Sequence, residues 1–206
     1  MPGTFPTLSY KNTEIRITSS YPTLVSGSNN LSVTTRSRGL HRFSVNIVIP
    51  EIHTWAAYAP LFAFIEKQKG RSSSFDFPIP TVVMPCNGAW DGTELVVGAT
   101  ASGATEIDID GAPADAVMKA GDLIQFTSHE KIYIVTDDVT FNGSGEGTVV
   151  LNTGLKTALV DNEVVKSHRR SSGLEMKCRF SSDENVYEPL NLGRYGKELT
   201  FYEDVS

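Results

Sequence analysis

Apolar and polar residues alternate along two stretches of this chain. From residue 41 to residue 49 every second side chain is apolar, which places Phe43 and Ile49 on the same face of one extended strand. Residues 174–180 alternate in the same way. We therefore predict a half-buried strand in each stretch. Shorter patterns predict further strands over 14–18, 31–35 and 199–203, with a turn-rich segment over 21–30.

One segment follows the period of an α-helix. From Thr54 to Gln68, apolar residues recur at spacings of three and four, which predicts a single buried helical face. Pro60 predicts a kink or the start of a second helix, and Gly70 is a plausible C-cap. Residues 72–80 contain two prolines and predict an edge strand, because proline cannot donate to a ladder. The expected apolar face consists of Trp55, Tyr58, Leu61, Phe62 and Ile65.

The pattern changes at about residue 85, where short strands begin to alternate with Gly, Asp and Asn turns. Strands over 123–126 and 131–135 flank a short polar break and predict a tight hairpin. A second hairpin turn is predicted at 142–147. Short strands without a helical period are typical of a small barrel or sandwich. The other expected strands cover 94–97, 106–109, 147–151 and 163–165.

The order of these elements predicts a mainly β protein built from two parts. Residues 1–82 and 174–206 together would form a β-sandwich with one packed helix, because the strand at 174–180 is too short to form a domain alone. Residues 83–173 would form a small β-barrel, similar to an oligonucleotide/oligosaccharide-binding (OB) fold, inserted between them. Charge also changes near this boundary, with eight basic and four acidic residues before residue 81 but six basic and thirteen acidic over 81–172.

The overall charge and the cysteine content limit the possible functions. A formal net charge of −6 argues against a protein held to nucleic acid by phosphate contacts. Two cysteines give no disulfide scaffold, and we expect two reduced thiols. No apolar run is long enough to cross a bilayer, so we expect no membrane insertion.

No set of residues in the sequence predicts catalysis or metal binding. The four histidines are scattered, and the cysteines are not in a C-x-x-C arrangement. We therefore predict no catalytic residue, no metal ligand and no cofactor. An enzyme using Glu66 or Asp108 remains a distant alternative. A closer alternative is a carbohydrate-binding module, for which Trp90 and Tyr133 are the candidate glycan-facing residues.

Basic residues in the first part and acidic residues near the end are candidates for contacts between subunits. Opposite charges on two patches of one chain suit a contact between neighbouring copies. The candidate subunit-interface residues are Arg36, Arg38, Arg42, Lys67, Lys69, Arg71, Asp183, Glu184 and Glu188.

Three segments resemble the distal tail proteins of bacteriophages, which form rings at the tip of long tails. These segments are 33–45 with the helix 58–70, the hairpin KAGDLIQFTSHEKIYIVT at 119–136, and 154–165. The resemblance implies a β-sandwich with an inserted OB-like barrel. It also implies a virion structural protein that assembles in the host cytoplasm into a hexameric ring. Such a ring joins the tail tube protein to the tail-tip or baseplate hub proteins and lets DNA pass without specific binding.

Overall fold

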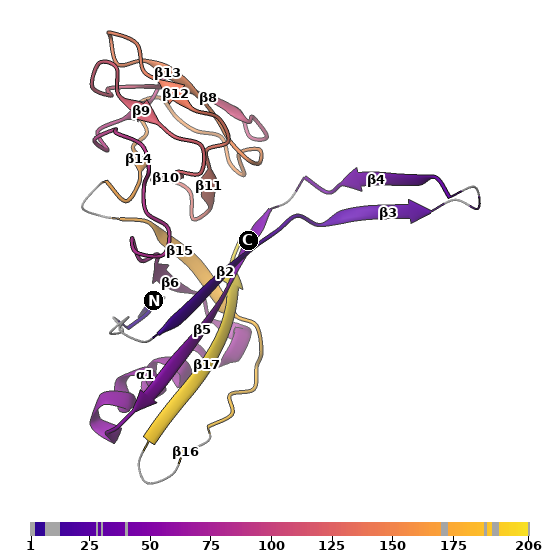
Figure 1. Ribbon diagram of the computed structural model, residues 1–206, viewed down its shortest axis with the longest axis vertical. Coiled ribbons are helices and arrows are strands. Elements are labelled where there is room, and N and C mark those ends of the chain that lie inside the picture. The colour runs from indigo at the N-terminus through magenta and orange to yellow at the C-terminus, as the bar shows by residue number, and fades with distance from the viewer. Residues whose placement is uncertain are drawn as a thin grey trace. The chain divides into compact units, whose positions relative to one another are not determined.

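The protein is mainly β with one α-helix, as the sequence predicts. The computed structural model describes residues 3–6, 13–27, 29, 31–39, 41–169, 173–187, 189–190 and 194–205. The chain forms two compact units (Figure 1). The sheet unit comprises Met1–Phe77 and Lys177–Ser206, and the inserted unit comprises Pro78–Met176. The sequence places the ends of the insertion at residues 83 and 173.

The sheet unit is organised around one seven-stranded sheet, in the order β1-β6-β15-β17-β5-β2 with β16 paired to β17. The strand β6 (Phe75–Pro78) is internal, so the prediction of an edge strand is wrong. Its proline lies at the end of the strand, where a missing N–H does not interrupt the parallel pairing with β1. The other strands are β1 (Gly3–Thr4), β2 (Glu14–Ser20), β5 (Arg42–Ile52), β15 (Glu175–Phe180), β16 (Pro189–Leu190) and β17 (Arg194–Glu203).

The strongest alternation in the sequence forms the centre of this sheet. In β5, Phe43, Val45, Ile47 and Ile49 are buried, and the residues between them point to the opposite face. β5 pairs in antiparallel register with both β2 and β17, which makes it a central strand. The alternation therefore predicts both the strand and its buried face correctly.

The helix α1 (Trp55–Gln68) covers the apolar face of the sheet. Thr54 is its N-cap and accepts a hydrogen bond from the backbone N–H of Ala57, while Lys69 ends it in the left-handed conformation. The helix runs through Pro60, so no second helix begins there. Phe64 packs edge-to-face against Phe5 and Phe75, with ring centroids 5.4 and 5.3 Å apart. A short 3₁₀ helix, Gly70–Ser72, follows.

The helical face expected from the sequence is only partly buried. Tyr58, Leu61 and Ile65 are buried as predicted, and Phe64 and Gln68 are buried with them. Trp55 remains 51% exposed. Trp55, the first residue of the helix, is therefore only partly covered by its neighbours.

The inserted unit consists of short strands around its own core, in three small sheets and several isolated bridges. Alternation again determines burial, since Ile107 and Ile109 lie in the core while Glu106 and Asp108 face solvent. The strands are β7 (Leu95–Val96), β8 (Glu106–Asp110), β9 (Val117–Met118), β10 (Leu123–Phe126), β11 (Ile132–Ile134), β12 (Val139–Thr140), β13 (Gly147–Val150) and β14 (Val165–Lys166).

The two turns predicted in this unit have different outcomes. β10 and β11 pair as a hairpin, with Ile124 opposite Tyr133, so that prediction is confirmed. At residues 142–147 the turn forms, because the Asn142 side chain accepts hydrogen bonds from the backbone N–H groups of Ser144 and Glu146. The flanking strands β12 and β13 pair with β9 and β8, however, and not with each other. The turn therefore joins two sheets.

One strand of the sheet unit lies where the sequence predicts turns, and it pairs with the strand predicted over 31–35. β3 (Thr23–Gly27) and β4 (Val33–Ser37) pair with each other and form a two-stranded ribbon that extends from β2 and β5 (Figure 1). The segment 21–30 therefore contains a strand that its composition does not predict.

Candidate assembly interface

The β3–β4 ribbon is the most exposed element of the sheet unit. Every residue of both strands is exposed. Leu24, Val25 and Val33 present 48, 65 and 64% of their surfaces to solvent, and Leu31 near the tip presents 91%. A two-stranded ribbon without a packing partner is marginally stable in water. Its exposed apolar side chains therefore make it a candidate contact surface.

The two faces of the ribbon differ in chemistry. Residues directly opposite each other in an antiparallel pair share a face. Leu24 lies opposite Arg36, and Arg38 follows two residues later, donating its backbone N–H to the carbonyl of Pro22. We call this the basic face. The other face, the uncharged face, consists of Thr23, Val25, Gly27, Val33, Thr35 and Ser37.

Arg36 and Arg38 differ from other arginines of the sheet unit. Among the described residues, no ion pair or hydrogen bond joins either guanidinium to another group. Arg42 instead lies over the ring of Tyr202, with its guanidinium carbon 4.5 Å from the ring centroid. Arg179 pairs with Asp204 at 2.6 Å. The basic face of the ribbon thus carries two exposed cations that have no partner among the described residues.

Two candidate interface residues from opposite ends of the sequence pair within one chain. Asp183 accepts hydrogen bonds from the backbone N–H of Arg71 at 2.9 Å and from its guanidinium at 3.1 Å. These contacts with Arg71 lower the pKa of Asp183. This pair is exposed, so it tethers two loops weakly. Arg71 and Asp183 are therefore already engaged before any neighbouring copy is present.

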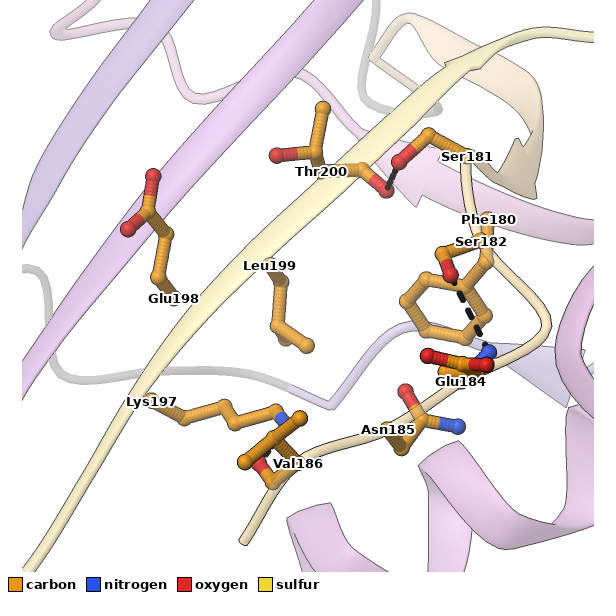
Figure 2. Close-up of a pocket in the computed structure, with 10 residues that line it drawn as sticks. All are labelled: Phe180, Ser181, Ser182, Glu184, Asn185, Val186, Lys197, Glu198, Leu199 and Thr200. Atoms are coloured by element: carbon orange, nitrogen blue, oxygen red, sulfur yellow. Dashed lines mark hydrogen bonds between the residues drawn. The ribbon is translucent and has the colours of Figure 1, made fainter. Parts of the chain in front are cut away.

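Of the remaining candidates, Lys69 lies two residues before Arg71 and Glu184 directly follows Asp183. Lys67 and Lys69 are exposed at the end of α1. Glu184 lines a surface pocket of about 260 Å³, and Ser182 accepts a hydrogen bond from its backbone N–H (Figure 2). Glu188 lies outside the described residues.

That pocket lies between β17 and the loop that follows β15 (Figure 2). Phe180, Leu199 and Val186 supply its apolar lining. Lys197 crosses one side, donates to the carbonyl of Val186, and lies 4.4 Å from the ring of Tyr187.

The sheet face opposite α1 carries its own polar contacts. Asn46 donates to Glu198 at 2.7 Å and to Thr200 at 3.0 Å, and Arg16 pairs with Glu14 at 3.2 Å. Positive and negative groups alternate on this face and largely satisfy each other. It is therefore a mixed surface and not a basic patch.

An aromatic cluster near the start of α1 was not predicted from the sequence. Trp55 lies 5.6 Å from Tyr195, and Tyr195 stacks on Tyr58 at 5.0 Å between ring centroids. Phe62 contacts Tyr187, whose hydroxyl donates to Glu66 at 2.5 Å. Burial and this contact raise the pKa of Tyr187. Tyr187 and Tyr195 are visible in the sequence as aromatic residues, but no sequence pattern predicts that they contact the helix.

The two residues proposed to face a glycan are buried in the inserted unit. Trp90 is 2% exposed and Tyr133 is fully buried in the same core. The hydroxyl of Tyr133 contacts Nδ1 of His129 at 2.9 Å and accepts from the backbone N–H of Lys156 at 3.0 Å. Stacking on a sugar requires an open ring face. Neither ring has one in this structure.

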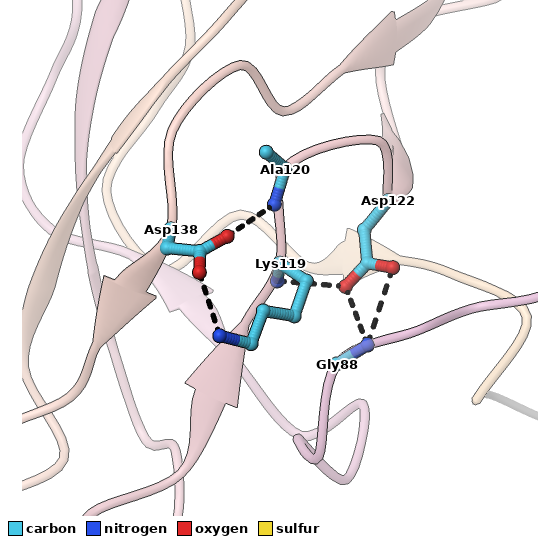
Figure 3. A network of polar contacts seen from close by, with 5 residues as sticks. All are labelled: Gly88, Lys119, Ala120, Asp122 and Asp138. Atoms are coloured by element: carbon cyan, nitrogen blue, oxygen red, sulfur yellow. Dashed lines mark hydrogen bonds and ion pairs between the residues drawn. The ribbon is translucent and has the colours of Figure 1, made fainter.

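Trp90 is held by a buried carboxylate. Asp122, which is fully buried, accepts hydrogen bonds from the indole N–H of Trp90 at 3.1 Å and from the backbone N–H groups of Asn87, Gly88 and Lys119. Nearby, the exposed Asp138 binds the Lys119 ammonium and the backbone N–H of Ala120 (Figure 3). The Ala-Gly-Asp turn of the hairpin is thus a structural clamp on residues 87–90.

The side chains considered for chemistry belong to different units. Glu66 accepts from Tyr187, and Asp108 accepts from the hydroxyl of Thr148 at 2.6 Å. Cys86 and Cys178 are both free thiols. Within the part of the chain that the structure describes, no three His, Cys, Asp or Glu side chains are grouped to hold a metal ion.

Comparisons with known proteins do not identify a family for this chain. No family model and no curated protein matches this chain. Among the described residues, no helix combines the length and the hydropathy of a membrane-spanning segment.

Proposed function

We propose that this chain is a structural subunit of the distal tail of a bacteriophage, where copies close into a ring. The ring, hexameric as in the family that its segments resemble, would join the tail tube protein to the tail-tip or baseplate hub proteins. The observation that carries the proposal is the β3–β4 ribbon. Its strands expose large apolar side chains on an element that has no core of its own.

The ribbon supports a contact between different patches of neighbouring subunits. A protruding element contacts a surface elsewhere on the next copy, so the interface is heterologous. Heterologous contacts form closed rings when the rotation between subunits closes. The protein would then have no function as a monomer, and its role would be mechanical.

Passage of DNA limits the charge that the bore of such a ring can carry. A basic bore would retain the duplex through its phosphates. The chain carries a net charge of −6, and we expect an acidic or neutral bore. A reconstructed ring with a strongly positive bore would contradict this expectation.

The proposal is tested by light scattering and negative-stain electron microscopy of the purified full chain. We expect closed rings for the wild type and monomers for Leu24→Asp. Leu24 is 48% exposed in the subunit, so the variant should fold with unchanged circular dichroism. Val160→Asp is the matched control, because Val160 is 63% exposed but lies in the inserted unit. A wild type that stays monomeric at all concentrations would refute the proposal.

A further inference from the structure

The basic face of the ribbon suits a partner of opposite charge. Residues 21–40 contain Arg36 and Arg38 but no acidic residue. Both arginines lie on one face and two residues apart, with Leu24 beside them. Two cations at this spacing, about 7 Å along a strand, favour a partner with carboxylates at a similar repeat.

The inserted unit offers that charge. It contains fourteen acidic and six basic residues, whereas the sheet unit contains ten acidic and twelve basic ones. The inserted unit is therefore at −8 and the sheet unit at +2. Charge alone directs the ribbon of one copy toward the inserted unit of another.

One strand of the inserted unit has the matching repeat. Along β8, Ile107 and Ile109 are buried, so Glu106, Asp108 and Asp110 occupy the other face at every second position. This spacing is the same as that of Arg36 and Arg38 on the ribbon.

A groove runs beside these carboxylates. It has a volume of about 340 Å³ and is lined by Val97, Asp108, Ile109, Asn142, Glu146, Gly147 and Thr148. Val97, which is 43% exposed, offers an apolar contact for Leu24. Asp108 is fixed by Thr148, and Glu146 is fixed by Asn142 at 3.0 Å. The groove therefore presents carboxylates in set positions beside an apolar side chain.

We propose that the basic face of the β3–β4 ribbon docks into the β8–β13 groove of a second copy of this chain. The proposal rests on the ring assembly proposed above and assigns its contact surfaces. Arg36 and Arg38 would pair with Glu106, Asp108 and Asp110, and Leu24 would pack on Val97. The uncharged face would then be left for a second contact within the assembly.

Charge reversal tests this pairing. The ribbon variant Arg36→Glu with Arg38→Glu, and the groove variant Glu106→Lys with Asp110→Lys, change exposed or half-exposed side chains. Each variant alone should lose rings, with the dissociation constant of the contact raised about tenfold or more by like-charge repulsion. A control variant, Glu130→Lys with Asp137→Lys, makes the same charge change on the inserted unit and should keep its rings.

Mixing the two variants identifies the partner as a second copy. In the mixture, each arginine ribbon meets an acidic groove and each glutamate ribbon meets a lysine groove, so rings should return. All four substitutions in one chain should also restore rings. Rings that persist in both single variants would overturn this contact and leave the ring proposal standing. Rescue only when the four substitutions share one chain would show a contact within the chain and overturn the assignment to a second copy. A monomeric wild type would overturn both proposals.

Discussion

Asp122 is the side chain whose replacement should cost the inserted unit the most stability. Its carboxylate is fully buried and accepts from Asn87 at 2.6 Å, Gly88 at 3.0 Å, Trp90 at 3.1 Å and Lys119 at 3.0 Å. Asp122→Asn preserves the volume but turns one acceptor oxygen into a donor. The N–H groups that donate to that oxygen in the wild type then face another N–H donor, in a site that solvent does not reach.

The cost follows from the number of bonds lost. A hydrogen bond to a charged group contributes about 1.5–3 kcal/mol. Loss of two such bonds gives about 3–6 kcal/mol, a large share of the ~5–15 kcal/mol that holds a domain folded. With a urea dependence of about 2 kcal/mol per molar, the midpoint of unfolding should fall by roughly 2 M.

Trp90 reports the transition directly, because its ring lies in the same core and bonds to Asp122. Urea unfolding followed by tryptophan fluorescence, in a Trp55→Phe background, isolates this signal. Asp138→Asn is the control on the same hairpin. Asp138 also accepts two hydrogen bonds, but its side chain is 54% exposed and water can replace them. Equal midpoints for the two variants would refute the role assigned to the buried clamp.

Three further results are expected. Gly88→Ala should destabilise the inserted unit, because its Cβ would lie 2.5 Å from Oδ2 of Asp122 and 2.6 Å from a backbone carbonyl oxygen; Gly143→Ala, which meets nothing within 4 Å, should be near neutral in the same urea assay. Burial lowers the pKa of His129, so its neutral form is favoured by folding, and this stability should be lost as the pH falls below about 6.5. Thermal melts at pH 7.5 and 5.5 should therefore differ less for His129→Gln than for the wild type, and an equal difference would exclude this cause. Burial raises the pKa values of both Cys86 and Cys178, but Cys178 has no exposed surface, so a thiol reagent should label Cys86 first and label both at one rate only in denaturant.

Sequence periodicity predicts the elements whose burial alternates. The strand β5 and the helix α1 each have one buried face, and both were predicted close to their observed bounds. The strands β10 and β11 were predicted equally closely, although β10 is buried on both faces. Two residues of β9 and two of β12 were missed, because so short a strand contains no full period. The position of a strand in a sheet depends on the strands with which it pairs, and no local pattern shows these partners. For this reason β6 was wrongly predicted at an edge.

The candidate interface was only partly predictable. Arg36 and Arg38 were named from their charge, but the strand β3 opposite them was not, because an element exposed on both faces lacks the alternation that burial imposes. The partnership of Arg71 with Asp183 joins residues more than one hundred positions apart, and no local pattern encodes it. The same limit applies to Trp90, because its hydrogen bond to Asp122 joins residues 32 positions apart.

The place where the inserted unit joins the chain has a consequence for how such proteins can diversify. The backbone N–H of Ile79 donates to the carbonyl of Leu174 at 3.0 Å, so the segments that enter and leave the inserted unit are hydrogen-bonded to each other. The first segment follows β6 and the second precedes β15, and these two strands are neighbours in the sheet. An inserted domain whose two ends lie side by side between adjacent strands can be replaced by one of a different size, or by a short turn. No other strand of the sheet would need to change. Natural or engineered replacement of residues 80–173 should therefore be tolerated by the remaining sheet, and recombination at this point would give the sheet unit a new inserted domain at little structural cost.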